Sequence, residues 1–193
     1  GTGAGTLKSV YGGYIGKATN AADATGNTVS IAGGTAQNVY GGYTNGTGKT
    51  TGNIVNIGYT DKNGAFHAVA DGTKVIGTIY GGNKSAEGNV LNVRGAITAG
   101  QIANFEKLNF AVNKDTAGKT LLTLNGGAAT SGLDWKKLTA QVGTTDLPTK
   151  SYAATRVTLM ANDKGIDFGS TYDKAKEVAA SDVYEFSVDT DTH

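Results

Sequence analysis

The chain of 193 residues lacks cysteine and contains a single proline, methionine and tryptophan. Without cysteine it forms no disulfide, and cysteine-based zinc sites and cysteine nucleophiles are excluded. Charge of one sign is also missing, because 17 lysines and arginines balance 16 aspartates and glutamates. Since no basic or acidic block stands out, the sequence gives no electrostatic basis for binding nucleic acid or a membrane surface. We expect no nucleic-acid partner.

Long hydrophobic runs are missing as well. No apolar stretch approaches the roughly 20 residues that a membrane helix needs. Residues 1 to 5 lack the basic and hydrophobic regions of a signal peptide. We therefore expect the chain to be a piece of a longer polypeptide.

Glycine, in contrast, is abundant. It accounts for 30 of the 193 residues, about twice the usual share. The single proline excludes a collagen-like chain or a proline-rich linker. We expect the glycines to serve turns.

Two linked motifs recur three times in the same order. A Tyr-Gly-Gly motif, preceded by valine or isoleucine, begins at Tyr11, Tyr40 and Tyr80. Each copy is followed by a Gly-Asn motif, which spans residues 26–31, 52–57 and 88–93. The second interval between the tyrosines is longer than the first, and the surplus lies in residues 58–73, where we expect a loop. Such internal repetition is typical of a solenoid.

Alternation within the Gly-Asn motif predicts short β-strands. One parity carries asparagine followed by two aliphatic residues in every copy, and the other parity is largely polar. The antiparallel sandwich is an alternative, but a unit that recurs intact favours parallel stacking of copies about 4.8 Å apart. Stacking would align Asn27, Asn53 and Asn89 in a hydrogen-bonded ladder. A tyrosine ladder would form beside it, facing inward or outward, because Gln37 and Asn38 leave the parity of that strand ambiguous.

The sequence changes character from Asn104 onward. The Tyr-Gly-Gly motif disappears, and most phenylalanines and the only tryptophan follow. Strands are predicted near residues 120–124, 156–160 and 183–188. We expect one continuous all-β parallel β-helix, with repeat rungs in residues 1–110 and atypical C-terminal coils and a cap in residues 111–193.

Several candidate chemical sites are weak. The segment 42–50 approaches a phosphate-binding loop, but its spacing is one residue too long and a strand follows instead of a helix. His67 and His193 are the only histidines, and we expect surface positions for both. The carboxylates of the repeat region stand in turn-like contexts, which favours solvated turn residues over a catalytic pair. We predict no catalytic residue, metal site or cofactor.

Tyrosines are the best candidates for a binding surface, because their flat amphipathic rings give contact area at low entropic cost. Stacked rings could present such a surface to a glycan or a protein of a host or neighbouring cell. The simpler interpretation, which we favour, is that the rings only pack one rung on the next. The candidate residues are Tyr11, Tyr14, Tyr40, Tyr43 and Tyr80.

The repeats resemble the passenger domains of bacterial autotransporters, the type V secretion adhesins. The Tyr-Gly-Gly-Tyr and Gly-Asn motifs look like their rungs, and residues 102–110 look like the segment where repeats give way to C-terminal coils. Residues 120–124 and 156–160 are similar to the two strands that follow. The resemblance implies a right-handed β-helix on the surface of a Gram-negative bacterium, outer-membrane anchored through a downstream barrel. It also implies a non-enzymatic role in adhesion, with a C-terminal part that assists folding during secretion.

Two other functions fit a β-helix. A carbohydrate-active enzyme would require a groove lined by two carboxylates about 5 to 9 Å apart. A phage-fibre-like structural solenoid would assemble as a trimer.

Overall fold

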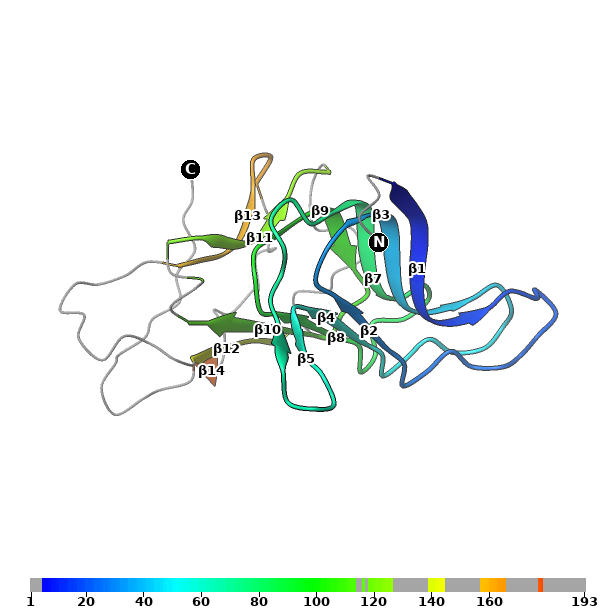
Figure 1. Ribbon diagram of the computed structural model, residues 1–193. Coiled ribbons are helices and arrows are strands. Elements are labelled where there is room, and N and C mark those ends of the chain that lie inside the picture. The colour runs from blue at the N-terminus through cyan, green and yellow to red at the C-terminus, as the bar shows by residue number, and fades with distance from the viewer. Residues whose placement is uncertain are drawn as a thin grey trace.

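The computed structural model describes residues 5–113, 116, 118–126, 139–144, 157–165 and 177–178. All regular secondary structure in these ranges is β-strand, which confirms the all-β prediction (Figure 1). These ranges accordingly hold no helix long and apolar enough to cross a membrane.

Two six-stranded sheets form the body of the molecule, and all strand pairs within them are parallel. Sheet A contains, in spatial order, β1 (Thr6–Ile15), β3 (Thr35–Thr44), β7 (Lys74–Gly82), β9 (Ile97–Ala103), β11 (Thr120–Leu124) and β13 (Thr158–Asn162). Sheet B contains β2 (Thr28–Ile31), β4 (Ile54–Ile57), β8 (Val90–Val93), β10 (Lys107–Val112), β12 (Thr139–Thr144) and β14 (Glu177–Val178). Apart from the excursion between β4 and β7, the chain alternates between the sheets, adding one strand to each in turn.

Like residues stack on like residues. Tyr11 pairs with Tyr40, and Tyr40 pairs with Tyr80. In sheet B, Val55 lies between Val29 and Leu91. The predicted parallel stacking of the repeat copies is therefore confirmed.

An aliphatic core lies between the two sheets. In β4, β8 and β10 alternate residues are buried, as period-two patterning requires. Complete burial of each aliphatic side chain contributes roughly 1.5–3 kcal/mol. The same cluster continues into β11 and β12, so it crosses the predicted boundary between residues 110 and 111. Its fully buried members from sheet A include Val39, Ile79, Ile102, Leu121, Leu122 and Leu124.

The parity of the Tyr-Gly-Gly strand changes inside β3, where Ala36 and Val39 are both buried although they lie three residues apart. The pairing of β3 with β7 shifts by one residue between Ala36 and Val39, so β7 carries one extra residue. The Asn38 side-chain oxygen accepts a hydrogen bond from the Thr78 N–H at 2.9 Å and satisfies the interrupted ladder. Beyond the bulge Val39 is buried, and the neighbouring Tyr40 faces outward.

Residues 58–73 leave the two sheets, as the sequence predicted. They contain a short antiparallel pair, β5 (Tyr59–Thr60) and β6 (Phe66–His67). The alternation of apolar and polar residues did not predict this hairpin, because each of its strands has only two residues.

The predicted strand at 120–124 is confirmed as β11, and that at 156–160 is found at Thr158–Asn162. The predicted strand at 183–188, Trp135 and His193 lie outside the described residues.

Candidate functional site

Five tyrosines gather on the outer face of sheet A, where three rings stack in one column. The Tyr11 and Tyr40 centroids are 5.2 Å apart with an interplanar angle of 9°. Those of Tyr40 and Tyr80 are 4.7 Å apart with an angle of 2°. These spacings follow the distance between neighbouring strands, so the backbone register sets the stack.

A second column stands beside the first. Tyr14 stacks on Tyr43 at 5.4 Å and 16°. Tyr43 also meets Tyr40 edge to face, at 5.1 Å and 78°. Aromatic pairs of this kind contribute about 0.5–1.5 kcal/mol beyond their buried area. The structure therefore brings together all five tyrosines named from the sequence: Tyr11, Tyr14, Tyr40, Tyr43 and Tyr80.

Both columns share a face because of the glycine pair between them. Residues three apart in a regular strand point to opposite faces. Gly41 and Gly42 are both buried, so the alternation breaks and Tyr40 and Tyr43 emerge on the same side.

The glycine pairs are not turn residues, which corrects the sequence-based expectation. They lie inside strands of sheet A and leave room for the asparagines that immediately precede the strands of sheet B. A Cβ on Gly13 would stand 2.5 Å from the Asn27 side-chain carbon, and one on Gly42 would stand 2.6 Å from the Asn53 amide nitrogen. The turn role belongs to the glycine before each asparagine, such as Gly52, whose φ of 66° disfavours other residues.

The predicted asparagine ladder is confirmed. The Asn27 side-chain amide donates to Asn53 Oδ1 at 2.9 Å, and that of Asn53 donates to Asn89 Oδ1 at 3.2 Å. Each of these oxygens also accepts the backbone N–H of the preceding asparagine, at 3.0 and 2.8 Å. Asn53 and Asn89 are completely buried. The Asn89 amide donates instead to the backbone carbonyls of Thr50, Ser85 and Asn104, so both side chains are satisfied without solvent.

A second amide ladder on the outer face of sheet B was missed. Asn56 donates to Ser30 Oγ at 3.2 Å, Asn92 to Asn56 at 2.8 Å, and Asn109 to Asn92 at 2.7 Å. Asparagine at the same position of successive strands was the signal that could have revealed it.

The tyrosine columns differ in exposure along their length. Tyr11 and Tyr14, on the terminal strand, are 38% and 54% exposed, whereas Tyr40, Tyr43 and Tyr80 are half-buried. Burial raises the pKa of Tyr40, and the neighbouring phenols add to this shift. Because Tyr40 has a ring on each face, it presents only its edge and hydroxyl outward. The columns thus pack across rungs, while the edges remain available for contacts.

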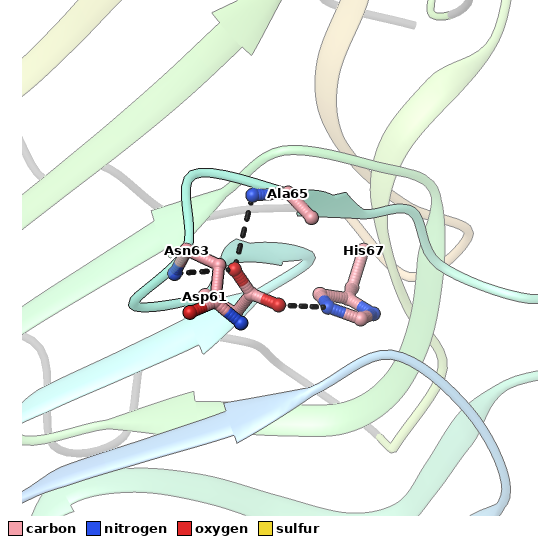
Figure 2. A network of polar contacts seen from close by, with 4 residues as sticks. All are labelled: Asp61, Asn63, Ala65 and His67. Atoms are coloured by element: carbon pink, nitrogen blue, oxygen red, sulfur yellow. Dashed lines mark hydrogen bonds and ion pairs between the residues drawn. The ribbon is translucent and has the colours of Figure 1, made fainter.

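The hairpin of residues 58–73 holds a separate polar cluster (Figure 2). His67 Nε2 lies 3.0 Å from Asp61 Oδ2, and Tyr59 stacks on the imidazole at 4.7 Å. Asp61 Oδ1 accepts the N–H groups of Asn63 and Ala65 at 2.8 and 3.0 Å. The hydrogen bond from His67, followed by these backbone bonds, lowers the pKa of Asp61. This arrangement holds the tight turn together.

His67 itself is a surface residue, as expected, with its side chain 43% exposed. Its pairing with Asp61 was not foreseen, although two such residues flanking a turn could have suggested it. No group of three or more histidine, aspartate or glutamate side chains suited to a metal occurs within the described ranges.

Comparison with protein-family models, with curated proteins and with solved structures finds no match to this chain.

Proposed function

We propose that this chain is a non-enzymatic, surface-exposed segment similar to the passenger of an autotransporter adhesin. In this proposal sheets A and B are two walls of a right-handed parallel β-helix, since crossovers between parallel strands are almost always right-handed. The solenoid serves as a rigid stalk, and its C-terminal coils assist folding during secretion. A downstream outer-membrane barrel of the same polypeptide anchors it.

One observation carries this proposal: both repeated motifs stack in register, strand upon parallel strand. Each repeat coil contacts the next through the tyrosine columns and the asparagine ladder. A body built this way extends by adding coils, and its stiffness arises from contacts between adjacent coils. Such an architecture suits a spacer that holds a contact surface away from a cell.

The use of buried polar groups also supports a structural role. The side-chain amides of Asn53 and Asn89 form hydrogen bonds between neighbouring coils. The Thr50 hydroxyl accepts the Lys84 N–H of the next coil at 3.1 Å. These groups hold coils together and do not point toward a substrate.

The location of the protein is the first test. Antibodies against the folded chain should label intact cells of the source organism, and external protease should remove the signal. Labelling that requires permeabilisation of the outer membrane would contradict the proposal. Sequencing downstream of the codon for His193 should reveal an outer-membrane barrel.

The tyrosine face is the proposed contact surface for a glycan or protein of another cell. A glycan array and an adhesion assay with the purified chain should identify a ligand whose binding falls in the double variant Tyr40→Ala, Tyr43→Ala. Tyr59→Ala, on the separate hairpin, is the matched control. Equal binding by both variants would remove the tyrosines from the contact surface.

A further inference from the structure

Tyr40 and Tyr80 form the most closely matched ring pair of the tyrosine columns. Their backbones pair in register between β3 and β7, and their ring centroids lie 4.7 Å apart at an interplanar angle of 2°. Both strands lie in the interior of sheet A, each with a neighbouring strand on either side. Parallel rings on residues paired in register place their hydroxyl-bearing edges side by side on the outer face of the sheet.

The hydroxyls of this pair are not held by the protein. Within the part of the chain that the structure describes, neither the Tyr40 nor the Tyr80 hydroxyl forms a hydrogen bond with another residue. The Tyr43 hydroxyl, in contrast, donates to Asn45 Oδ1 at 2.8 Å. Because Tyr40 and Tyr80 are both partly exposed, water reaches their ring edges and can accept the proton of each hydroxyl.

Two phenols held in this way can be joined by oxidation. A one-electron oxidant, such as a haem peroxidase that has reacted with hydrogen peroxide, removes one electron from each phenol, and each hydroxyl releases its proton to water. The unpaired electron of each radical resides partly on the ring carbon Cε, beside the hydroxyl-bearing carbon. When a bond forms between Cε of one ring and Cε of the other, the hydrogen on each of these carbons moves as a proton to the phenol oxygen of its own ring. The two phenols lose two hydrogen atoms in total, and hydrogen peroxide is reduced to two molecules of water.

The fold supplies the proximity that this coupling requires. The register of β3 on β7 holds the two rings together continuously, whereas tyrosines of separate molecules must first collide. Proximity alone does not select the pair, because Tyr40 and Tyr43 have a similar centroid separation of 5.1 Å. The Tyr43 ring, however, stands at 78° to that of Tyr40, and its hydroxyl is bound to Asn45. We therefore expect Tyr40 to couple to Tyr80 in preference to Tyr43.

We propose that Tyr40 and Tyr80 are the site of an oxidative cross-link, a Cε–Cε dityrosine bond that joins one repeat coil to the next. The chain has no cysteine, so no disulfide can join its coils. A dityrosine bond closes the segment between Tyr40 and Tyr80 into a loop, which lowers the conformational entropy of the unfolded chain and stabilises the folded one. The cross-link requires a one-electron oxidant of the peroxidase and peroxide class, and it is independent of export and of any adhesion ligand.

The test oxidises the complete folded chain in dilute solution, where molecules rarely meet. One sample receives a haem peroxidase with hydrogen peroxide, and a second receives a photo-excited ruthenium tris-bipyridine complex with persulfate, which is small enough to reach half-buried edges. Mass spectrometry of the digested protein should find the peptide of Tyr40 joined to that of Tyr80, lighter by two hydrogen atoms than their sum. The yield should fall at least about tenfold when the chain is unfolded in urea before oxidation, because the proximity of the rings is then lost.

Phenylalanine variants test the consequence of the bond without disturbing the stack. Tyr80→Phe keeps the ring and removes only the phenol, and Tyr59→Phe, on the separate hairpin, is the matched control. Oxidation should raise the urea midpoint of the parent chain and of Tyr59→Phe, but not that of Tyr80→Phe. Three outcomes overturn the proposal: no Tyr40–Tyr80 link with either oxidant, an equal yield from the unfolded chain, or links that form chiefly at another pair or between molecules. A midpoint that rises equally in Tyr80→Phe would contradict the stabilising role of the bond.

Discussion

The repeat coils and the coils that follow Ala103 stack in the same two sheets but are held together differently. In the repeat coils the asparagine that immediately precedes a strand of sheet B fills the space left by a glycine pair of sheet A. After Ala103, which pairs with Tyr80, the chain carries Phe105, and this side chain is fully buried. The glycine pair and the asparagine are lost from the sequence together, because the asparagine side chain needs the space that the glycines leave empty.

At the junction between the repeat coils and the later coils, side-chain hydrogen bonds satisfy the backbone groups of the last repeat coil. Asn104 adopts a φ of 58°, which asparagine tolerates better than most residues, and its amide donates to the Gly82 carbonyl at 2.7 Å. Glu106 follows in place of the next ladder asparagine, and its carboxylate accepts the Gly88 N–H at 2.5 Å. The ladder therefore ends with its last backbone groups satisfied.

The largest loss of stability is expected when a glycine of the repeat coils is replaced. We expect Gly42→Ala to cost about 4 kcal/mol or more of unfolding free energy, because its Cβ would collide with the Ala24 carbonyl and with Asn53. Gly143→Ala is the matched control in a later strand, since nothing lies within 4 Å of its added Cβ. Urea unfolding should separate the two variants, and similar midpoints would contradict the assigned role of the glycine pairs.

In the later coils, the largest loss of stability is expected from the removal of apolar packing. Phe105→Ala should reduce the unfolding free energy by about 3–4 kcal/mol, because it leaves a cavity beneath Gly81. Phe66→Ala, at an exposed hairpin position, should change it by less than about 1 kcal/mol. Thermal unfolding of both variants checks this difference. An equal, small effect would show that the chain re-packs around the missing ring.

Removing one rung of the inner ladder should have an intermediate effect. Asn53→Ala removes the acceptor of the Asn27 N–H and of the Asn27 side-chain amide, and one of the two donors to Asn89 Oδ1. We expect a loss of about 2–3 kcal/mol. Asn56→Ala interrupts the outer ladder, where water can replace the lost bonds, and should cost less than about 1 kcal/mol. Denaturant titration of the two variants tests whether burial decides how much a ladder contributes to the unfolding free energy. Equal losses would contradict that conclusion.

The tyrosine columns should weaken in alkali. The folded-state pKa of Tyr40 is raised, so folding favours its neutral form. Its contribution is complete below the ordinary tyrosine pKa and is lost as the pH rises through the folded-state pKa. The unfolding midpoint of the parent chain should fall more steeply in this range than that of Tyr40→Phe. Parallel curves would show that Tyr40 does not couple folding to pH.

The smallest effect is expected at the hairpin, which belongs to neither set of coils. The folded-state pKa of Asp61 is lowered, so its contribution is present above the ordinary aspartate pKa and is lost as the pH falls through the folded-state pKa. Asp61→Asn should increase amide exchange at Asn63 and Ala65 while leaving the protection of β4 unchanged. Loss of protection throughout β4 would instead make the hairpin part of the core.

Much of this arrangement could be predicted from the sequence because the repeats encode it directly. Recurrence in a fixed order predicted parallel stacking, and alternation placed Val55 and Ile57 in the core. The direction of the tyrosines could not be predicted, since the parity changes between Ala36 and Val39 inside β3, where Asn38 accepts the Thr78 N–H of another strand. The Asp61–His67 pair was not predicted, because strands of two residues leave no periodic signal that would place the two side chains opposite each other.

By itself, the sequence determined which residues stack on which, because identical motifs in successive coils satisfy the same hydrogen bonds and fill the same space. It also determined the members of the tyrosine cluster and of the inner asparagine ladder. Only the tertiary structure decided why the glycines are present. Their Cβ positions are occupied by atoms of residues from other coils, such as the Asn53 side chain against Gly41 and Gly42. A close approach between distant segments leaves no mark in the sequence around either of them, so the requirement for glycine is visible only in the folded molecule.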